Sequence, residues 1–228
     1  MLKNIIVSWS SGKDSTLTLE RLMESDEYNV VGLFTTYLED EVPFQATPIE
    51  VVEMQAELLG FPLVKIALPE VFPSNELYQS LVVNGLKSSN LDFEYVAFGD
   101  MFCNGIADYR RSYIESAGWQ CVFPLMGEAS NKLANEILSR GIITMLVTAD
   151  GDRISRDLCG RWYDEQLLQE LPKEADPCGE HGEFHTLVTE TRSFNGKLEL
   201  QLTYIEHGKR FSHQRYQAKS LLKPNRRV

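Results

Sequence analysis

Apolar residues in the first half of the chain form short runs that alternate with amphipathic stretches. The apolar runs predict buried strands over residues 5–9, 30–37, 63–68, 95–98 and 119–123. Apolar positions that recur every three or four residues predict helices between them, over residues 16–25, 49–59, 76–86 and 106–117. Because strand and helix alternate throughout, we predict an α/β fold over residues 1–124, with a parallel sheet and helices on both of its faces.

The pattern changes after residue 124. Helices are predicted over residues 131–139 and 162–171, with a strand over 142–148. Later segments alternate with a two-residue period, which predicts strands over 187–191, 197–207 and 211–222. The dipeptide Asn195-Gly196 is typical of a hairpin turn. We therefore predict a smaller α+β domain over residues 125–228.

A small polar turn joins the first strand to the first helix. It reads Ser10-Ser11-Gly12-Lys13-Asp14-Ser15. A strand, a tight turn and a helix together direct backbone N–H groups at an anion. The turn is not a Walker A loop, because the first glycine of that motif would fall on Val7 and Asp14 follows Lys13. Lys13 adds positive charge and Asp14 can hold Mg²⁺ through oxygen. The ordinary alternative is a turn with Ser15 or Asp14 as the helix N-cap.

Further candidate residues lie at strand ends and on the helix over 106–117. Asp100 follows Gly99 at the end of a strand, where open α/β sheets bind ligands. Arg110 and Arg111 could clamp a phosphate or carboxylate, or could pair with acids at the surface. The remaining candidates in this half are Tyr109 on the same helix and Thr35 and Thr36 at the end of the second strand.

A loop rich in glycine, acid and histidine precedes the strand over 187–191. It contains Glu180, Glu183 and His185 within residues 179–186. The two carboxylates, three residues apart around Gly182, suggest a loop that presents oxygens to a ligand, an amine or a metal. The alternative is a glycine-rich turn that enters a strand, with His185 merely packed. If the loop is functional, we expect it to fold back against residues 10–15.

Charge and cysteine usage restrict the class of protein. The 228 residues carry a net charge of −11, which disfavours binding to nucleic acid phosphates. Seven of the 22 Lys and Arg lie in residues 207–228, which hold no Asp or Glu, so that 15 remain against 33 acids. That basic end is expected to be a solvated edge strand, or else a small patch for an anionic partner.

Four cysteines, Cys103, Cys121, Cys159 and Cys178, show no C-x-x-C spacing. We therefore expect a reduced cytoplasmic compartment without disulfides or a zinc site. The chain has no apolar run of membrane-spanning length and enters a strand at once, so neither a membrane span nor a signal peptide is expected.

Residues 10–15 resemble the S-G-G-x-D-S loop of the ATP pyrophosphatase (PP-loop) superfamily, with Ser11 in place of the first glycine. Gly99-Asp100, Tyr109-Arg110-Arg111, Pro124-Leu125 and the segment Gly-Glu-His-Gly-Glu-Phe-His-Thr at 179–186 follow in the order of the diphthine–ammonia ligase branch, which carries a G-E-x-G-E-F-x-T segment. The resemblance implies a nucleotide α-hydrolase (HUP-like) first domain and a smaller second domain, with the active site between them.

The resemblance also implies an activity. A substrate carboxylate attacks the α-phosphate of ATP, pyrophosphate leaves into residues 10–15 with Mg²⁺ at Asp14, and ammonia or an amine attacks the acyl-adenylate. Lys13, Asp14, Glu180 and Glu183 are the implied catalytic residues, and Glu183→Gln is expected to keep ATP binding but lose amide formation.

By the same resemblance, the implied nucleotide contacts are Ser10, Ser11, Gly12, Lys13, Asp14, Ser15, Thr35 and Thr36. The implied substrate contacts are Asp100, Tyr109, Arg110, Arg111 and His185.

Three departures from the family pattern bear on the acyl substrate rather than on the ATP chemistry. The two arginines after Tyr109 are adjacent rather than spaced, Phe44-Gln45-Ala46 stands where family members often carry a histidine, and His185 stands where glutamate is common.

Two other functions remain open. One is a regulatory module that binds a nucleotide without turnover. The other is an RNA-modifying thiolase-type enzyme, against which the acidic composition and the lack of a cysteine pair count. The sequence leaves a homodimer open.

The charge distribution yields a first prediction. Because acids outnumber bases more than twofold before residue 207, we expect no tRNA binding tighter than about 1 μM at physiological salt. Fluorescence anisotropy with labelled tRNA, repeated over a salt series, measures it. Tighter binding would favour the thiolase alternative.

Overall fold

The computed structural model describes residues 1–102 and 105–223. Cys103 and the last part of the basic end, with Arg226 and Arg227, lie outside the described residues.

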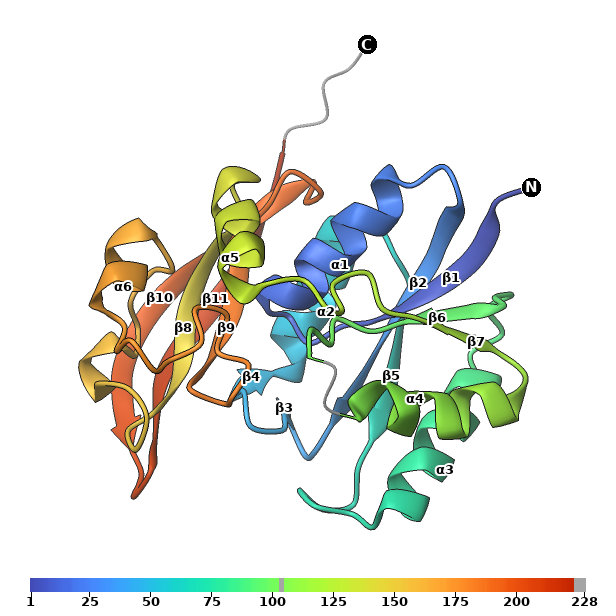
Figure 1. Cartoon of the computed structure of the whole chain (residues 1–228), viewed down its shortest axis with the longest axis horizontal. Helices are drawn as coiled ribbons and strands as arrows, with labels where there is room; N and C mark the ends of the chain where they lie inside the picture. Colours follow the sequence, from blue (N-terminus) through green and yellow to red (C-terminus); the bar gives the residue numbers. More distant parts are fainter. Residues whose placement is uncertain (103–104, 224–228) are drawn as a thin grey trace.

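The first half forms a five-stranded sheet in the order β5-β2-β1-β6-β7, and every neighbouring pair is parallel (Figure 1). The strands are β1 (Lys3–Ser8), β2 (Tyr28–Tyr37), β5 (Leu63–Ala67), β6 (Tyr95–Ala97) and β7 (Gln120–Val122). The predicted parallel α/β sheet is confirmed.

Helices cover both faces of this sheet, as predicted. They are α1 (Lys13–Glu24), α2 (Ile49–Leu59), α3 (Asn75–Lys87) and α4 (Ile106–Ile114), which a 3₁₀ turn (Glu115–Ala117) extends. Ile5 and Val7 of β1 belong to the core under α1 and α2, whereas Ile6 between them belongs to the core under α3 and α4. The alternation of side chains along a strand therefore separates the two apolar layers.

The second half forms a four-stranded antiparallel sheet in the order β10-β11-β8-β9. Its strands are β8 (Ile143–Asp150), β9 (Phe184–Glu190), β10 (Gly196–His207) and β11 (Phe211–Leu222), and the helices α5 (Ser130–Ser139) and α6 (Glu165–Glu170) and a 3₁₀ turn (Arg156–Leu158) accompany them. Both sheets contribute to the larger apolar core. The predicted domain boundary at 124/125 falls between β7 and α5, and the division into two domains there stays a prediction.

Three predicted segments differ from the structure. The helix predicted over 162–171 shrinks to α6, because Asp164 caps it by accepting from the Leu167 N–H and Trp162 is in a bridge with Met145. Strand β9 starts at Phe184, earlier than residue 187, since it pairs with the end of β8. Residues 39–47, over which the sequence predicts no strand, contain a small hairpin of β3 (Glu41–Val42) and β4 (Thr47–Pro48).

No helix within residues 1–102 and 105–223 is long and apolar enough to cross a membrane.

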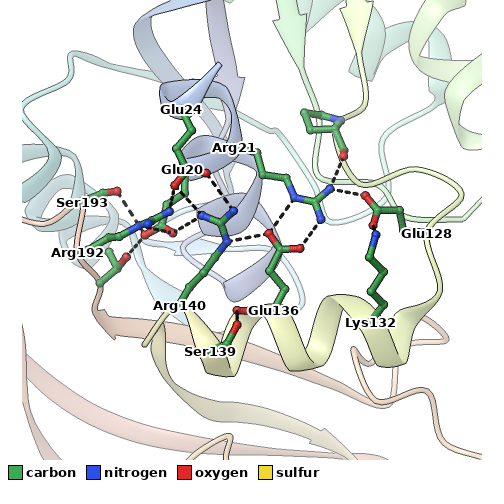
Figure 2. A network of polar contacts seen from close by, with 12 residues as sticks. Glu20, Arg21, Glu24, Glu128, Lys132, Glu136, Ser139, Arg140, Arg192 and Ser193 are labelled. Carbon is green, nitrogen blue, oxygen red and sulfur yellow. Dashed lines mark hydrogen bonds and ion pairs between the residues drawn. The ribbon is translucent and has the colours of Figure 1, made fainter. Parts of the chain in front are cut away.

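A network of ion pairs ties α1 to the second half of the chain (Figure 2). Glu20 on α1 is 1% exposed and pairs with Arg140 at the end of α5 (3.2 Å) and with Arg192 after β9 (3.1 Å). The Thr191 hydroxyl also donates to Glu20. Arg21, the next residue of α1, pairs with Glu136 of α5 and with Glu128. The helix that begins at Lys13 is therefore held at its far end against α5 and against the segment that follows β9.

This network yields a second prediction. Removing the charge of Glu20 leaves two arginines without their buried partner, so Glu20→Gln should lower the free energy of unfolding by about 3 kcal/mol. Urea denaturation measures the change. Lys132→Met, which removes an exposed partner of Glu128 in the same network, is the control and should cost about 0.5 kcal/mol. Equal losses in the two variants would show that burial of Glu20 is not what makes the network stabilising.

Candidate functional site

The turn between β1 and α1 leaves the N-terminus of α1 without a side-chain cap. Gly12 occupies the N-cap position, so neither Ser15 nor Asp14 caps the helix. The hydroxyls of Ser15 and Thr16 donate to the Gly12 carbonyl, at 3.0 and 2.9 Å. An N-cap residue without an acceptor leaves N–H groups of the first turn to other acceptors, such as an anion. The N–H of Lys13, the first residue of α1, donates to the Thr186 hydroxyl.

Ser11 has a left-handed backbone, with φ of 70°. Glycine adopts this conformation without a penalty, whereas another residue pays about 1–2 kcal/mol. This is the position at which the resembled loop carries its first glycine. Ser11 is fully buried, and its carbonyl accepts from the Val188 N–H of β9 at 2.9 Å. The second sheet therefore contributes to holding the turn in its strained shape.

Lys13 is 2% exposed and spans the two halves of the chain. Its ammonium pairs with Asp14 (2.8 Å) and donates to the Cys178 carbonyl. The ammonium nitrogen also lies 5.4 Å from the centroid of the Phe184 ring. Burial alone would lower the pKa of Lys13, but the charges around it, Asp14 first, outweigh burial and raise the pKa. Burial raises the pKa of Asp14 against the opposing effect of Lys13. Lys13 therefore stays charged in a site largely closed to water.

The loop over 179–186 lies against the turn over 10–15, as the sequence predicts. A cavity of about 200 Å³, the phosphate-loop cavity, lies between them. It is lined by Ser10, Gly12, Lys13, Asp14, Gln45, Cys178, Gly179, Glu180, Gly182, Phe184, His185 and Thr186. The Lys13 N–H donates to the Thr186 hydroxyl at 3.2 Å, which fixes β9 beside the first residue of α1.

The two predicted catalytic glutamates point in different directions. Glu180 borders the phosphate-loop cavity, and burial, followed by the repulsion of Asp14, raises its pKa to about 7. Glu183 is 1% exposed, and its carboxylate accepts from the backbone N–H groups of Asp176 and His181, both at 2.9 Å. Glu183 thus holds the loop together, while Glu180 faces the site.

His185 also lines the phosphate-loop cavity, from the start of β9. Burial first, then Lys13 and His213, lower its pKa to about 4. The imidazole is therefore neutral at neutral pH and can offer one donor and one acceptor to a ligand.

A second cavity of about 320 Å³, the strand-end cavity, opens at the carboxyl ends of β1 and β2. Thr35 and Thr36 both line it, as the resemblance implies. The rest of its lining is Ser8, Trp9, Ser10, Phe34, Val42, Pro43, Phe44, Gln45, Leu68, Val71, Pro73, Tyr78 and Arg110. Ser10 and Gln45 border both this cavity and the phosphate-loop cavity, so the two adjoin.

The two adjacent arginines of α4 have different surroundings. Arg110 lines the strand-end cavity, and its guanidinium also pairs with Asp100 (3.3 Å) and donates to the Tyr113 hydroxyl (3.3 Å). Arg111 pairs instead with Asp108 and Glu115 of its own helix, at 3.5 and 3.6 Å. The structure therefore brings Arg110 to the site and gives Arg111 the alternative role of surface pairing.

Asp100 and Tyr109 line a third cavity of about 450 Å³ together with Met101, Phe102, Gly105, Ile106 and Glu180. Glu180 thus borders both this cavity and the phosphate-loop cavity.

The sequence did not reveal three residues at the site. Gln45 borders two cavities, Trp9 lines the strand-end cavity, and Thr186 holds the Lys13 N–H. Thr186 belongs to the G-E-x-G-E-F-x-T segment, which was a usable signal. Gln45 lies in the segment Phe44-Gln45-Ala46, where the resembled family often carries a histidine, so its position also gave a signal. Trp9 had none, because it reaches the site only once the sheet has formed.

Two known proteins resemble the chain at low identity. Diphthine–ammonia ligase from Schizosaccharomyces pombe is 24% identical over 226 residues, a match that covers 87% of this chain and 36% of that protein. The chain thus spans about a third of the length of this curated relative. The solved U34-tRNA thiolase NcsA from Methanococcus maripaludis, with its [4Fe-4S] cluster, aligns with a TM-score of 0.37 and 16% identity, over 60% of this chain and 56% of that one. This structural likeness is too weak to bear on function.

A family model identifies the first half of the chain. The model of the diphthamide synthase N-terminal domain matches residues 3–120, slightly more than half of the 228 residues. The matched region contains β1, β2, β5 and β6 of the parallel sheet and ends at the first residue of β7, and it includes the turn over 10–15 and both Thr35 and Arg110. The suspected diphthine–ammonia ligase branch of the ATP pyrophosphatases is thereby supported, and the chain belongs to the diphthamide synthase N-terminal domain family.

Proposed function

We propose that the protein is an ATP-dependent amide ligase that releases AMP and pyrophosphate. The observation that carries this proposal is the arrangement of the strand-end and phosphate-loop cavities, which adjoin at Ser10 and Gln45. Glu180 and Lys13 both line the phosphate-loop cavity. A nucleotide, a phosphate-binding turn and a proton acceptor can thus share one continuous site.

ATP would place its nucleoside in the strand-end cavity, against Trp9, Thr35 and Thr36. Its phosphates would pass Ser10 into the phosphate-loop cavity, toward the first turn of α1. The buried Lys13 ammonium faces that cavity and offsets phosphate charge in surroundings where water does little to weaken the attraction.

Asp14 is suited to hold Mg²⁺. One of its carboxylate oxygens, Oδ1, is buried without a hydrogen-bond partner, while the other pairs with Lys13. One carboxylate together with phosphate oxygens is a common way for proteins to bind Mg²⁺. Bound there, the ion would supply charge neutralisation for the departing pyrophosphate.

The reaction would proceed in two displacements. An oxygen of the substrate carboxylate forms a bond to the α-phosphorus, the bond between the α-phosphorus and the bridging oxygen breaks, and pyrophosphate leaves toward residues 10–15. The nitrogen of ammonia or an amine then attacks the acyl carbon, AMP leaves, and the proton lost by the nitrogen passes to Glu180. A carboxyl with a pKa near 7 is well matched to take up that proton at neutral pH.

Substrate contacts would come from the residues around Glu180. Asp100 and Tyr109 line the cavity that Glu180 also borders, and His185 lies on the phosphate-loop side. Arg110 would bind an anionic group in the strand-end cavity by exchanging part of its pairing with Asp100. We propose no substrate role for Arg111, and we propose Glu183 as a support of the loop rather than a catalytic residue.

The products of ATP cleavage test this proposal. With ammonium and a panel of carboxylic acids, ³¹P NMR should detect AMP and pyrophosphate, whereas ADP and orthophosphate would contradict the proposal. Bound nucleotide without cleavage would favour a regulatory module.

Lys13→Met should abolish turnover. It should also lower the free energy of unfolding by about 3 kcal/mol, because Asp14 loses its buried partner. The sequence alone, in which Lys13 belongs to a small polar turn, could not show that this lysine is buried.

The two glutamates can be separated experimentally. Glu180→Gln should retain ATP binding and pyrophosphate release but slow amide formation about 10²- to 10⁴-fold. In the unaltered protein, the rate of amide formation should rise with pH through about 7, because Glu180 must lose its proton to act as a base.

The free energy of unfolding should change with pH in the opposite direction. The folded protein holds this proton more tightly than the unfolded chain, so the free energy of unfolding contributed by Glu180 falls as pH rises from about 4.5 to about 7.

Glu183→Gln is the matched control for this experiment. It weakens one of two backbone hydrogen bonds and should cost about 1–3 kcal/mol of stability. The pH dependence near 7 should remain in this variant. A loss of that dependence in Glu183→Gln but not in Glu180→Gln would reverse the two assignments.

A further inference from the structure

Gln55 of α2 is a fully buried amide whose hydrogen bonds converge on the phosphate-binding turn. Its Oε1 accepts from the Trp9 indole N–H at 2.9 Å. Its Nε2 donates to the Val188 carbonyl at 2.7 Å and to the Ser11 carbonyl at 3.3 Å. One side chain thus joins the end of β1, the turn and the edge of β9.

These partners fix the orientation of the amide. The indole N–H can only donate and the two carbonyls can only accept, so the reversed amide would lose all three hydrogen bonds. Any other orientation of the Gln55 amide would leave a buried polar group without a hydrogen bond.

The hydrogen bond to Ser11 acts on the most strained residue of the turn. The Ser11 carbonyl receives the Gln55 amide and the Val188 N–H, and Ser11 has φ of 70°. In a trans peptide the carbonyl and the following N–H point in opposite directions. Holding the Ser11 carbonyl toward Gln55 therefore turns the Gly12 N–H away from it, toward the Ser10 hydroxyl at 3.4 Å. Ser10 borders both cavities, so this N–H faces the path of the phosphates.

We propose that Gln55 is a positioning residue for pyrophosphate binding. It touches no ligand itself but sets the direction of the Ser11–Gly12 peptide, with Trp9 as its anchor. Without it, Ser11 can relax toward a right-handed backbone, which rotates the Gly12 N–H out of the site. This inference rests on the proposed binding of ATP phosphates to residues 10–15, but it does not depend on which bond of ATP is cleaved or on the acyl substrate.

The test measures binding, so that it stays separate from turnover. Affinities for α,β-methylene-ATP and for adenosine are determined by calorimetry for the unaltered protein, Gln55→Met and Gln55→Glu. Methionine has a similar volume without the hydrogen bonds, and glutamate keeps the shape but directs a carboxylate oxygen at two carbonyls. We expect both variants to bind α,β-methylene-ATP about tenfold more weakly or worse, with adenosine affinity changed less than about twofold.

Gln214 supplies a matched control. It is also a buried glutamine, and its Nε2 donates to two backbone carbonyls, of Tyr204 at 3.3 Å and of Arg215 at 2.7 Å. Gln214→Met should lose stability in urea much as Gln55→Met does, yet keep both affinities. A parallel loss of adenosine and α,β-methylene-ATP binding in the Gln55 variants, or an equal effect of Gln214→Met, would overturn the proposal.

Ser11→Gly tests the mechanism in a double-mutant cycle. Glycine adopts the left-handed conformation without strain, so the turn should depend less on Gln55 for its shape. The weakening of α,β-methylene-ATP binding by Gln55→Met should therefore shrink at least about threefold in the Ser11→Gly background. An undiminished effect would overturn the proposed role of Gln55. Failure of the unaltered protein to bind α,β-methylene-ATP would overturn both this role and the proposed function, whereas absence of AMP and pyrophosphate with intact binding would overturn only the latter.

Discussion

The exposed edge of a β-sheet carries unpaired backbone groups, and in this protein the β9 edge is covered by the turn over residues 10–15. The Val188 N–H donates to the Ser11 carbonyl, and the Thr186 hydroxyl accepts from the Lys13 N–H. The turn and β9 therefore supply hydrogen-bond partners to each other. The shape of the turn therefore depends on the second sheet, although the turn belongs entirely to the first.

The same contact explains the electrostatics of the site. Closing β9 and the loop before it over the turn buries Lys13 with Asp14 and brings Glu180 close to both. Burial raises the pKa of Glu180 into the neutral range and lowers that of His185 well below it. The carboxyl group of Glu180 and the neutral imidazole of His185 thus line the same phosphate-loop cavity, together with the positively charged Lys13. Pairs of groups whose pKa values are shifted in this way are typical of sites where protons are transferred.

Helix α1 is fixed against the second half of the chain at both of its ends. Lys13 contacts Cys178 and Thr186 at the first residue of the helix. Glu20, two turns further along, pairs with Arg140 and Arg192 (Figure 2). Two attachments on one helical face prevent the helix from rotating about its axis. The ion pairs therefore contribute to the geometry of a site that they do not touch.

The sequence by itself determined the parallel sheet, its helices and the turn over 10–15, whereas it gave the contact of that turn with the loop over 179–186 only as an expectation. Hydrophobic periodicity and short motifs depend on neighbouring residues, so a single sequence reveals them. Only the tertiary structure decided that Glu180 faces the phosphate-loop cavity while Glu183 binds its own loop, and that Arg110 but not Arg111 reaches the strand-end cavity. Gln55 became visible only there, since its partners lie 44, 46 and 133 residues away in the chain. Residue type gives the chemistry a side chain can perform, but the direction in which it points depends on packing between distant segments.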